Sequence, residues 1–278
     1  MCKPVVKWAG GKTQLLDELL PLVPEYDTYY EVFVGGGALF FALKPKKAVL
    51  NDFNKQLMNL YKQIKYHNTQ LQKQLDILEN QHIDSPEYYN RKRGEFNEYI
   101  IKNEYSLISA SLFLYLNKTG YNGLYRLNSN GLFNTPYGKK KKVKLYDKDN
   151  MDSVSRLLKG TRLLNGDFEK ACKDCKKGDF VFFDSPYYNT FDTYQAGGFS
   201  KDDHIRLSSL FDYLTSRGVK CLLTNSNEKF IKDLYKKYDI KVVDVKRMIN
   251  CDGNKRTGKE IIVKNYWWLI KIKFGKIV

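Results

Sequence analysis

The segment Asp184-Ser185-Pro186-Tyr187 carries the residue types best suited to chemistry, and it directly follows the apolar run from Phe180 to Phe183. The run predicts a buried strand, which Pro186 ends. Asp184 is therefore expected at the carboxyl edge of a sheet, where α/β folds bind ligands. Its carboxylate and the Ser185 carbonyl could accept both N–H bonds of an adenine amino group and so expose the nitrogen lone pair. Tyr187 could stack on an extruded base and tolerate a nearby cation.

Taken alone, this segment is better explained as an ordinary Asp-Ser-Pro turn after a strand, which is common. A second motif, Gly35 to Gly37, stands between the apolar run Tyr30 to Val34 and a short helix expected from Ala38 to Leu43. Glycines at Gly35 and Gly37 let the backbone approach a ligand closely and adopt positive φ. This turn lacks the last glycine of the dinucleotide-binding pattern, because Phe40 stands in its place.

Asp52 adds to the glycine motif, because it follows the next expected strand, Ala48 to Leu50, and lies 15 residues after Gly37. An acidic residue at that position of a nucleotide-binding sheet accepts the ribose hydroxyls. The alternative interpretation is a tight turn followed by a capping aspartate.

A third motif, Lys7-Trp8-Ala9-Gly10-Gly11-Lys12-Thr13, contains a Gly-Lys-Thr sequence. A phosphate-binding loop would need a glycine five residues before Gly11, where Val6 stands, so a P-loop is excluded. Trp8 and Lys12 beside a flexible turn suit a ligand that has an adenine ring and a carboxylate tail.

The elements that position these motifs predict an α/β doubly wound sheet, because a strand, a glycine turn, a helix and a strand follow in order. The pattern resumes after residue 160 with strands expected at 161–164, 180–183 and 219–223. Ser200 and Asp203 have capping-box spacing and begin a helix expected over 200–217. Two closing strands are expected at 241–245 and 261–268.

Residues 55–159 differ in character and predict a helical insert. Leu57, Leu60, Tyr61 and Ile64 share one helical face, and so do Leu71, Leu75 and Leu78. The stretch 108–116 predicts a more apolar helix, and 117–144, with its basic run at 139–142, predicts a hairpin or loop. The expected domains are therefore a discontinuous one, 1–54 with 160–278, and an insert, 55–159.

The charge balance favours a polyanionic partner. The 278 residues include 47 Lys and Arg against 31 Asp and Glu, for a formal charge of +16. Nucleic acid is the first candidate partner and an acidic membrane surface the second, and a basic surface without a partner is the alternative. No apolar stretch reaches the roughly 18 residues of a membrane span, and no secretory signal is expected at the N-terminus.

The cysteines predict neither a disulfide framework nor a metal site. There are five, and Cys172-x-x-Cys175 lacks the second pair that a zinc site requires. We therefore expect a cytoplasmic protein in a reducing compartment, with no metal.

Together, the three motifs in this order resemble those of the DNA adenine methylase (Dam) family. The resemblance is to the D12 class with the alpha arrangement, and it covers almost the whole chain. It implies a Rossmann-like S-adenosylmethionine-dependent methyltransferase sheet with an inserted, mainly helical target-recognition domain. The cofactor residues implied by the resemblance are Trp8, Lys12, Gly35, Gly37, Asp52, Asp167, Phe168 and Asp184.

By the same resemblance, the catalytic residues are Asp184, Ser185, Pro186 and Tyr187, which stand where the family has Asp-Pro-Pro-Tyr. The departure is Ser185. The family's second position acts through its backbone carbonyl, which serine retains, so catalysis need not be lost, although the rigidity of one proline is.

The insert also resembles the recognition hairpin of family members that modify GATC. The resemblance implies that Arg126 reads a guanine and that Tyr121 wedges into the base stack, and arginine is the commonest guanine reader in the major groove. Asn122, Leu124 and Pro136 would touch the remaining bases. Arg247, Asn250 and Arg256 look like part of the family's closing hairpin and would grip phosphates.

The leading hypothesis is an adenine-N6 methyltransferase that acts on double-stranded DNA, at GATC, after base flipping. A DNA-binding homologue with weakened or lost catalysis and the same fold acting on RNA or protein remain alternatives. The resemblance implies a bacterial or phage-encoded enzyme. It leaves open whether a cognate restriction endonuclease acts separately on the same DNA.

Overall fold

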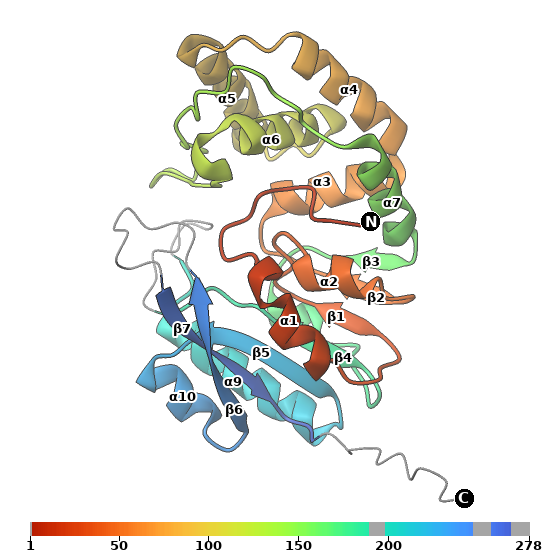
Figure 1. The fold of residues 1–278 in the computed structure, drawn as a ribbon, viewed down its shortest axis with the longest axis vertical. Coiled ribbons are helices and arrows are strands. Elements are labelled where there is room, and N and C mark those ends of the chain that lie inside the picture. The colour runs from red at the N-terminus through yellow and green to blue at the C-terminus, as the bar shows by residue number, and fades with distance from the viewer. Residues whose placement is uncertain (1, 189–197, 247–256, 268–278) are drawn as a thin grey trace, which may run out of the picture.

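The computed structural model describes residues 2–188, 198–246 and 257–267, which form a sheet below a cap of helices (Figure 1). Within these residues seven strands pair in the order β3-β2-β1-β4-β5-β7-β6. The strands are β1 (Tyr29–Glu31), β2 (Ala48–Leu50), β3 (Thr161–Leu163), β4 (Phe180–Phe183), β5 (Lys220–Ser226), β6 (Asp239–Lys246) and β7 (Thr257–Lys264).

The sheet is parallel from β3 to β5, and β7 runs antiparallel to both β5 and β6. Strand order reverses after β1, because β2 and β3 lie on one side of it and β4 and β5 on the other. The carboxyl ends of β1, β2 and β4 therefore meet at one edge of the sheet. The expected α/β doubly wound, Rossmann-like methyltransferase fold is confirmed.

Several strand boundaries differ from the sequence prediction. The strand expected at 30–34 is β1, Tyr29–Glu31, because the chain then leaves the ladder: the Val34 amide donates to the Asn51 carbonyl at 2.9 Å. The strand expected at 161–164 is one residue shorter, and that at 219–223 extends as β5 to Ser226. The closing strands span 239–246 and 257–264, and Trp268 lies outside the described residues.

Helices cover both faces of the sheet, and alternate residues of β4 separate two cores. Phe180 and Phe182 belong to one buried cluster with residues of α2, whereas Val181 and Phe183 belong to another with residues of α9. The helices are α1 (Leu16–Leu19), α2 (Ala38–Leu43), α8 (Phe168–Ala171), α9 (Lys201–Ser216) and α10 (Lys229–Tyr235). The predicted capping box at Ser200 and Asp203 begins α9.

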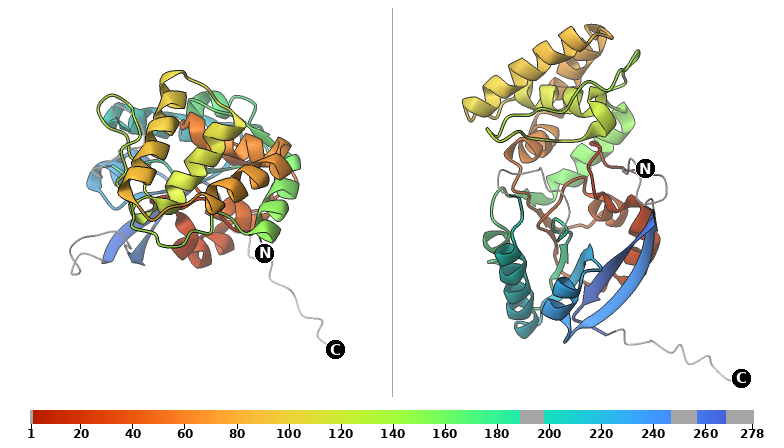
Figure 2. Two further views of the ribbon diagram at one scale, coloured as in Figure 1. Left: turned by 90° about the horizontal axis from the view of Figure 1, so that it is seen from above. Right: turned by 90° about the vertical axis from the view of Figure 1, so that its left-hand side faces the viewer.

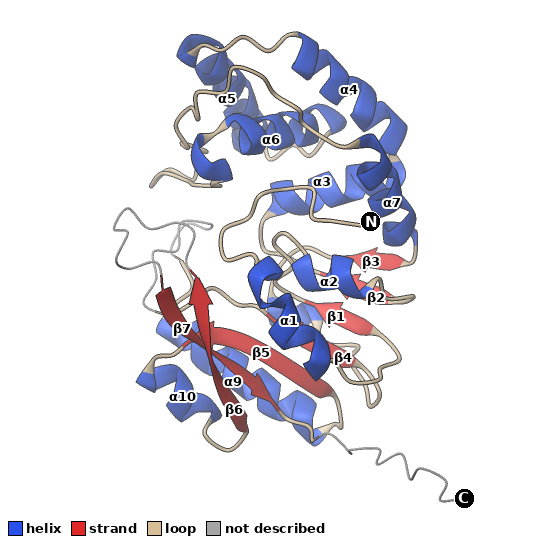
Figure 3. Ribbon diagram, viewed as in Figure 1, coloured by secondary structure: helices blue, strands red, loops and turns tan. Residues whose placement is uncertain are grey.

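The cap consists of α3 (Lys55–Tyr66), α4 (Asn68–Asn80), α5 (Pro86–Ile101), α6 (Leu107–Thr119) and α7 (Lys148–Lys159), and Figure 3 shows that it is mainly helical. The right-hand view of Figure 2 shows the same separation of cap and sheet from another side, and the left-hand view looks down onto the cap. The two predicted helical faces are buried, on α3 and on α4. A single residue, Gly160, separates the end of α7 from the start of β3. The insert therefore leaves the sheet after β2 and rejoins it at β3, the strand next to β2.

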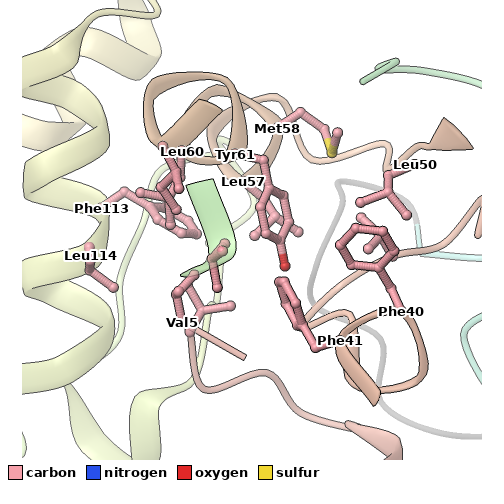
Figure 4. Close-up of a cluster of buried hydrophobic side chains, with 14 of the residues drawn as sticks. Val5, Phe40, Phe41, Leu50, Leu57, Met58, Leu60, Tyr61, Phe113 and Leu114 are labelled. Carbon is pink, nitrogen blue, oxygen red and sulfur yellow. The ribbon is translucent and has the colours of Figure 1, made fainter. Parts of the chain in front are cut away.

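The cap packs directly on the layer above the sheet. α3 places Leu57 and Tyr61 beside Phe40 and Phe41, near Phe113 of α6 (Figure 4). All of these side chains are buried, and one continuous hydrophobic cluster includes residues from both the sheet side and the cap. Burial of this apolar surface attaches the insert to the sheet.

The segment expected as a hairpin from 117 to 144 begins later, because α6 continues through Thr119. It then makes a short 3-10 turn, Tyr121–Gly123, and two isolated antiparallel bridges, Gly120 with Tyr137 and Leu127 with Phe133. We call residues 120–138 the hairpin loop. In the described ranges, no helix combines the length and apolar character needed to cross a bilayer.

Candidate active site and nucleic-acid interface

A cavity of about 1380 Å³ lies between the carboxyl edge of the sheet and the hairpin loop. Residues from all three sequence motifs line it, together with residues of the hairpin loop. The lining residues named by the sequence analysis are Trp8, Lys12, Gly35, Asp52, Asn122, Leu124, Arg126, Asp167, Phe168, Asp184, Ser185, Pro186 and Tyr187. Gly37, Tyr121 and Pro136 lie outside this lining.

Asp184 occupies the centre of the site, directly after β4. Lys12 Nζ lies 2.6 Å from Asp184 Oδ1, and Thr224 Oγ1 donates to the same oxygen at 2.8 Å. Burial raises the pKa of the Asp184 carboxyl, and Lys12 and Thr224 oppose that shift. In the described part of the chain both contacts reach Oδ1, so Oδ2 is left to accept a hydrogen bond from a ligand.

Ser185 is almost completely buried at 2% exposure, and its hydroxyl accepts a hydrogen bond from Asn225 Nδ2 at 3.0 Å. The oxygen of the same amide accepts from the Tyr188 backbone N–H at 3.3 Å. The turn after β4 is therefore tied to the end of β5 by side chains.

Tyr187 is fixed at its hydroxyl, which donates to Glu260 Oε2 of β7 at 2.6 Å. Its ring is approached by Lys12 Nζ, 4.8 Å from the ring centroid. Burial raises the pKa of the Tyr187 hydroxyl, and the charges of Asp184 and Glu260 raise it further. Tyr187 thus stays neutral, as a stacking surface requires, and its ring tolerates a cation at close range.

The turn after β1 contains two glycines with positive φ, a backbone conformation that residues with a side chain rarely adopt. Gly35 has φ of +45°, and a Cβ atom there would lie 2.6 Å from Trp8 Cδ1. Only glycine permits this close approach of the indole. Gly37 has φ of +68° and caps α2.

Side chains hold the same turn from two directions. Asp52 Oδ2 accepts from the Gly35 N–H at 2.9 Å, and Tyr61 donates to the Gly35 carbonyl at 2.9 Å. Asp52 Oδ1 accepts from the Asn54 N–H, so the carboxylate also organises its own turn. Asp52 also lines the cavity, so its carboxylate lies where a ligand can reach it.

The Asp167–Phe168 pair forms a further wall of the cavity. Asp167 caps α8 through Oδ1, and Arg206 Nη2 donates to its Oδ2 at 2.8 Å. The Arg206 guanidinium also lies over the Phe168 ring, 4.9 Å from the centroid. The aromatic face of Phe168 is thus oriented by a cation on α9.

In the hairpin loop, Arg126 is exposed and is oriented by Asn134. Its Nε donates to Asn134 Oδ1 at 2.8 Å and its Nη2 to the Asn134 carbonyl at 3.1 Å. The Nη1 edge is directed away from these two bonds. Tyr121 is 52% exposed, and its backbone N–H donates to the Pro136 carbonyl at 2.9 Å.

Arg247, Asn250 and Arg256 lie outside the described residues. The sequence analysis assigned no role to several cavity residues: Lys7, Asn54, Tyr125 and Arg206. Lys7 belongs to a named motif and Tyr125 precedes Arg126, which is a signal that sequence reading could have used. Arg206 stands in an ordinary helix and carries no such signal.

The four cysteines in the described residues are free, with Cys172 and Cys175 buried. Those residues contain no group of three or more His, Cys, Asp or Glu side chains that could hold a metal ion.

The model of one protein family, described as D12 class N6 adenine-specific DNA methyltransferase, matches residues 8–249 of this chain. The matched stretch includes the glycine turn, the Asp184 segment and the whole helical insert, and all of the Lys7–Thr13 motif except Lys7.

Curated relatives extend over nearly the whole chain. The Type II methyltransferase M1.LlaDCHI of Lactococcus lactis subsp. cremoris is 41% identical over 275 residues, which is 95% of each chain. The Type II methyltransferase M.MjaIII of Methanocaldococcus jannaschii is 39% identical over 288 residues, 95% of this chain and 99% of the relative. The DNA adenine methylase of Escherichia coli (strain K12) is 28% identical over 256 residues, 90% of each.

Proposed function

The chain belongs to the D12 class N6 adenine-specific DNA methyltransferases, and on that premise we propose that it transfers a methyl group from S-adenosylmethionine to a flipped adenine in duplex DNA. One observation carries the proposal. Asp184, the Gly35 turn and Arg126 line a single cavity although they come from three distant parts of the chain. A methyltransferase needs a methyl-donor site, an acceptor for the amino group and a DNA reader within reach of one another.

The residues of the cavity fit S-adenosylmethionine. Asp52 offers acceptors for ribose hydroxyls, Phe168 offers a ring face for an adenine, and Trp8 closes the glycine turn. Lys12 is the cation suited to a carboxylate tail, and it is 5% exposed, so an anion there would be poorly screened by water. When bound, S-adenosylmethionine supplies an electrophilic methyl group on a sulfonium.

Asp184 and the Ser185 carbonyl prepare the acceptor nitrogen. The adenine amino group donates one N–H to Asp184 Oδ2 and the other to the Ser185 carbonyl, which draws the nitrogen toward a tetrahedral geometry. Its lone pair would then be available to the methyl group that a bound S-adenosylmethionine would supply, with the thioether as the leaving group. The nitrogen loses one proton, Asp184 is positioned to receive it, and solvent takes it up afterwards.

Tyr187 holds the extruded base. Its hydroxyl is fixed by Glu260, so its ring offers a rigid face on which an adenine stacks. Stacking offsets part of the cost of removing the base from the duplex.

We assign DNA reading to the hairpin loop, with GATC as the target site. Arg126 contacts a guanine through the guanidinium edge that Asn134 leaves open, and the exposed Tyr121 fills the gap left by the flipped base. Asn122, Leu124 and Pro136 contact the remaining bases. The net charge of +16 attracts the phosphate backbone of DNA. Arg247, Asn250 and Arg256 contact individual phosphates.

In this proposal residues 55–159 form the target-recognition domain, and residues 1–54 and 160–278 form the catalytic domain. Two of the relatives bear the name Type II methyltransferase. A role in restriction-modification, with a cognate endonuclease acting separately in the same cytoplasm, follows by that likeness.

The decisive experiment incubates the protein with isotope-labelled S-adenosylmethionine and unmethylated plasmid, followed by sequencing that maps the modified adenines. We expect label at N6 of the adenine in GATC. Modification at another sequence would overturn the site assignment alone. Equal transfer to duplex RNA would overturn the DNA preference, and the absence of transfer to either would overturn the reaction.

A further inference from the structure

The turn after β4 lacks the constraint that the first proline of Asp-Pro-Pro-Tyr provides, because Ser185 stands in its place. Proline restricts φ, whereas serine leaves the backbone free to move. The carbonyl of residue 185 and the carboxylate of Asp184 must nevertheless both point at one nitrogen. Something else has to hold this turn.

Asn225 provides a contact that serine at position 185 completes and that proline could not. Its Nδ2 donates to Ser185 Oγ at 3.0 Å, and proline has no atom there that could accept this bond. Its Oδ1 accepts from the Tyr188 N–H at 3.3 Å and from the Ser226 N–H at 2.8 Å. One side chain thus joins the beginning and the end of the turn.

The strand pairing places Asn225 for this task. Phe183, the last residue of β4, pairs with Leu223 in the parallel ladder, so the residues that follow β4 lie beside the last residues of β5. Thr224 reaches Asp184 and Asn225 reaches Ser185, each one residue further along. Asn225 is 1% exposed and Ser185 2%, so water competes little for the bond between them.

We propose that Asn225 is a positioning residue, which replaces the restraint of the missing proline by binding the Ser185 hydroxyl. The proposal rests on the proposed function, because it assigns the 184–187 turn to the reaction. Asn225 is not among the residues that line the cavity, so it acts through the direction of the Ser185 carbonyl.

The test is a double-mutant cycle of Asn225→Ala and Ser185→Pro, in which kcat and KM for methyl transfer are measured at steady state. We expect Asn225→Ala to lower kcat by about three- to tenfold with serine at 185, with KM for both substrates within about twofold. With proline at 185 the same change should cost less than about twofold in kcat. An equal cost in both backgrounds, or a loss that lies in KM, would overturn the proposal.

A variant that leaves Asn225 in place covers the case in which Asn225→Ala does not fold. Ser185→Ala removes only the hydroxyl, and we expect its kcat to fall below that of Ser185→Pro. If the alanine variant equals or exceeds the proline variant, the hydroxyl does not position the turn.

A matched control exists in the insert, where Asn59 Nδ2 donates to Ser109 Oγ, also at 3.0 Å and also buried. Asn59→Ala should lower the melting temperature and keep kcat within about twofold. If Asn59→Ala lowered kcat as much as Asn225→Ala does, general destabilisation would explain both losses, and the proposal would be overturned.

Hydrogen exchange separates this inference from the proposed function, because it needs no reaction. Asn225→Ala and Ser185→Ala should speed amide exchange in residues 184–188, and Ser185→Pro should slow it in the Asn225→Ala background. Unchanged exchange in both alanine variants would overturn the positioning role even if methylation proceeds. Absence of methyl transfer in the unmodified protein would overturn the proposed function and leave the exchange result to decide about Asn225.

Discussion

Lys12 Nζ lies 2.6 Å from Asp184 Oδ1, and the two side chains are only 6% and 17% exposed. The two residues are far apart in the chain, and Lys12 follows the Gly10-Gly11 pair near the N-terminus. Its side chain reaches the end of β4. A buried ion pair of this kind stabilises little in total, but loss of one partner leaves an uncompensated charge. Lys12 therefore helps to keep Asp184 ionised in a place where burial favours protonation.

Asp184→Ala should abolish most of the methyl transfer. The change removes the acceptor for one amino N–H, and we expect kcat to fall by about 10²- to 10⁴-fold. DNA binding, measured by fluorescence anisotropy, should remain. Asp174→Ala is the control, because Asp174 is a surface carboxylate paired with Arg162. Residual transfer near that of the unchanged protein would remove Asp184 from the catalytic role.

The rate should fall on the acid side at a higher pH than an ordinary aspartate would give. Burial raises the pKa of Asp184 above its usual value of 3.8, and only the ionised form accepts two hydrogen bonds at Oδ1 and one at Oδ2. Activity is therefore present above the raised pKa and lost as the pH falls through it. Thr224→Val removes one donor that lowers this pKa, so the midpoint of the kcat profile should move upward. An unmoved midpoint would contradict the assignment.

Gly35→Ala should disrupt the site, and Gly94→Ala provides its control. A Cβ atom at position 35 would lie 2.6 Å from the Trp8 ring and would sit on a backbone with φ of +45°, whereas a Cβ at position 94, inside α5, meets nothing within 4 Å. We expect Gly35→Ala to change the tryptophan fluorescence and to weaken S-adenosylmethionine binding at least about tenfold. Gly94→Ala should leave binding unchanged and stabilise the protein by up to about 1 kcal/mol.

Arg126→Ala should relax the sequence preference at one guanine. A lost bidentate contact corresponds to about 1–3 kcal/mol, or roughly 5- to 150-fold in discrimination. The measurement compares kcat/KM on duplexes that differ at that base pair. Arg156→Ala, on α7, is the control and should alter only general affinity. Full retention of the preference by Arg126→Ala would show that another residue reads the base.

Glu31→Gln should change how stability depends on pH. Burial raises the pKa of Glu31 to about 8, although Tyr29 donates to its carboxylate at 2.7 Å. The folded state thus binds a proton that the unfolded chain releases near its ordinary pKa of 4.5, so stability falls as pH rises from 4.5 to 8. Glutamine removes this slope. We expect the difference in melting temperature between Glu31→Gln and the unchanged protein to shift in favour of the variant as the pH rises towards 8. Glu98→Gln, at an exposed position, should show no such change with pH.

Local features of this protein followed from the sequence. The capping box at Ser200 and Asp203 joins residues three apart, and the buried faces of α3 and α4 repeat with the period of a helix. Interactions of this range depend on neighbours in the chain, so a single sequence carries them. The order of the motifs likewise indicated the sheet and the place of the insert.

Strand ends were less predictable. The strand beginning at Tyr29 stops at Glu31 although Val32 and Val34 are just as buried, because their backbone groups bind Asn51 rather than a neighbouring strand. Hydrophobicity reports burial and not the partner of a hydrogen bond. The apolar run after Tyr30 was therefore read as strand throughout.

The residue types and their order along the chain determined the α/β class and the glycine turn, and they made Asp184 the candidate carboxylate. Only the tertiary structure decided that Lys12 pairs with Asp184, that Asn225 binds Ser185, and that Glu260 fixes Tyr187. These contacts join residues 40 to 172 positions apart. Those of Asn225 and Glu260 exist because β4 pairs with β5 and β5 with β7, whereas Lys12 comes from a short 3-10 helix outside the sheet. Strand order is a property of the packed sheet as a whole, and no local stretch of sequence encodes it.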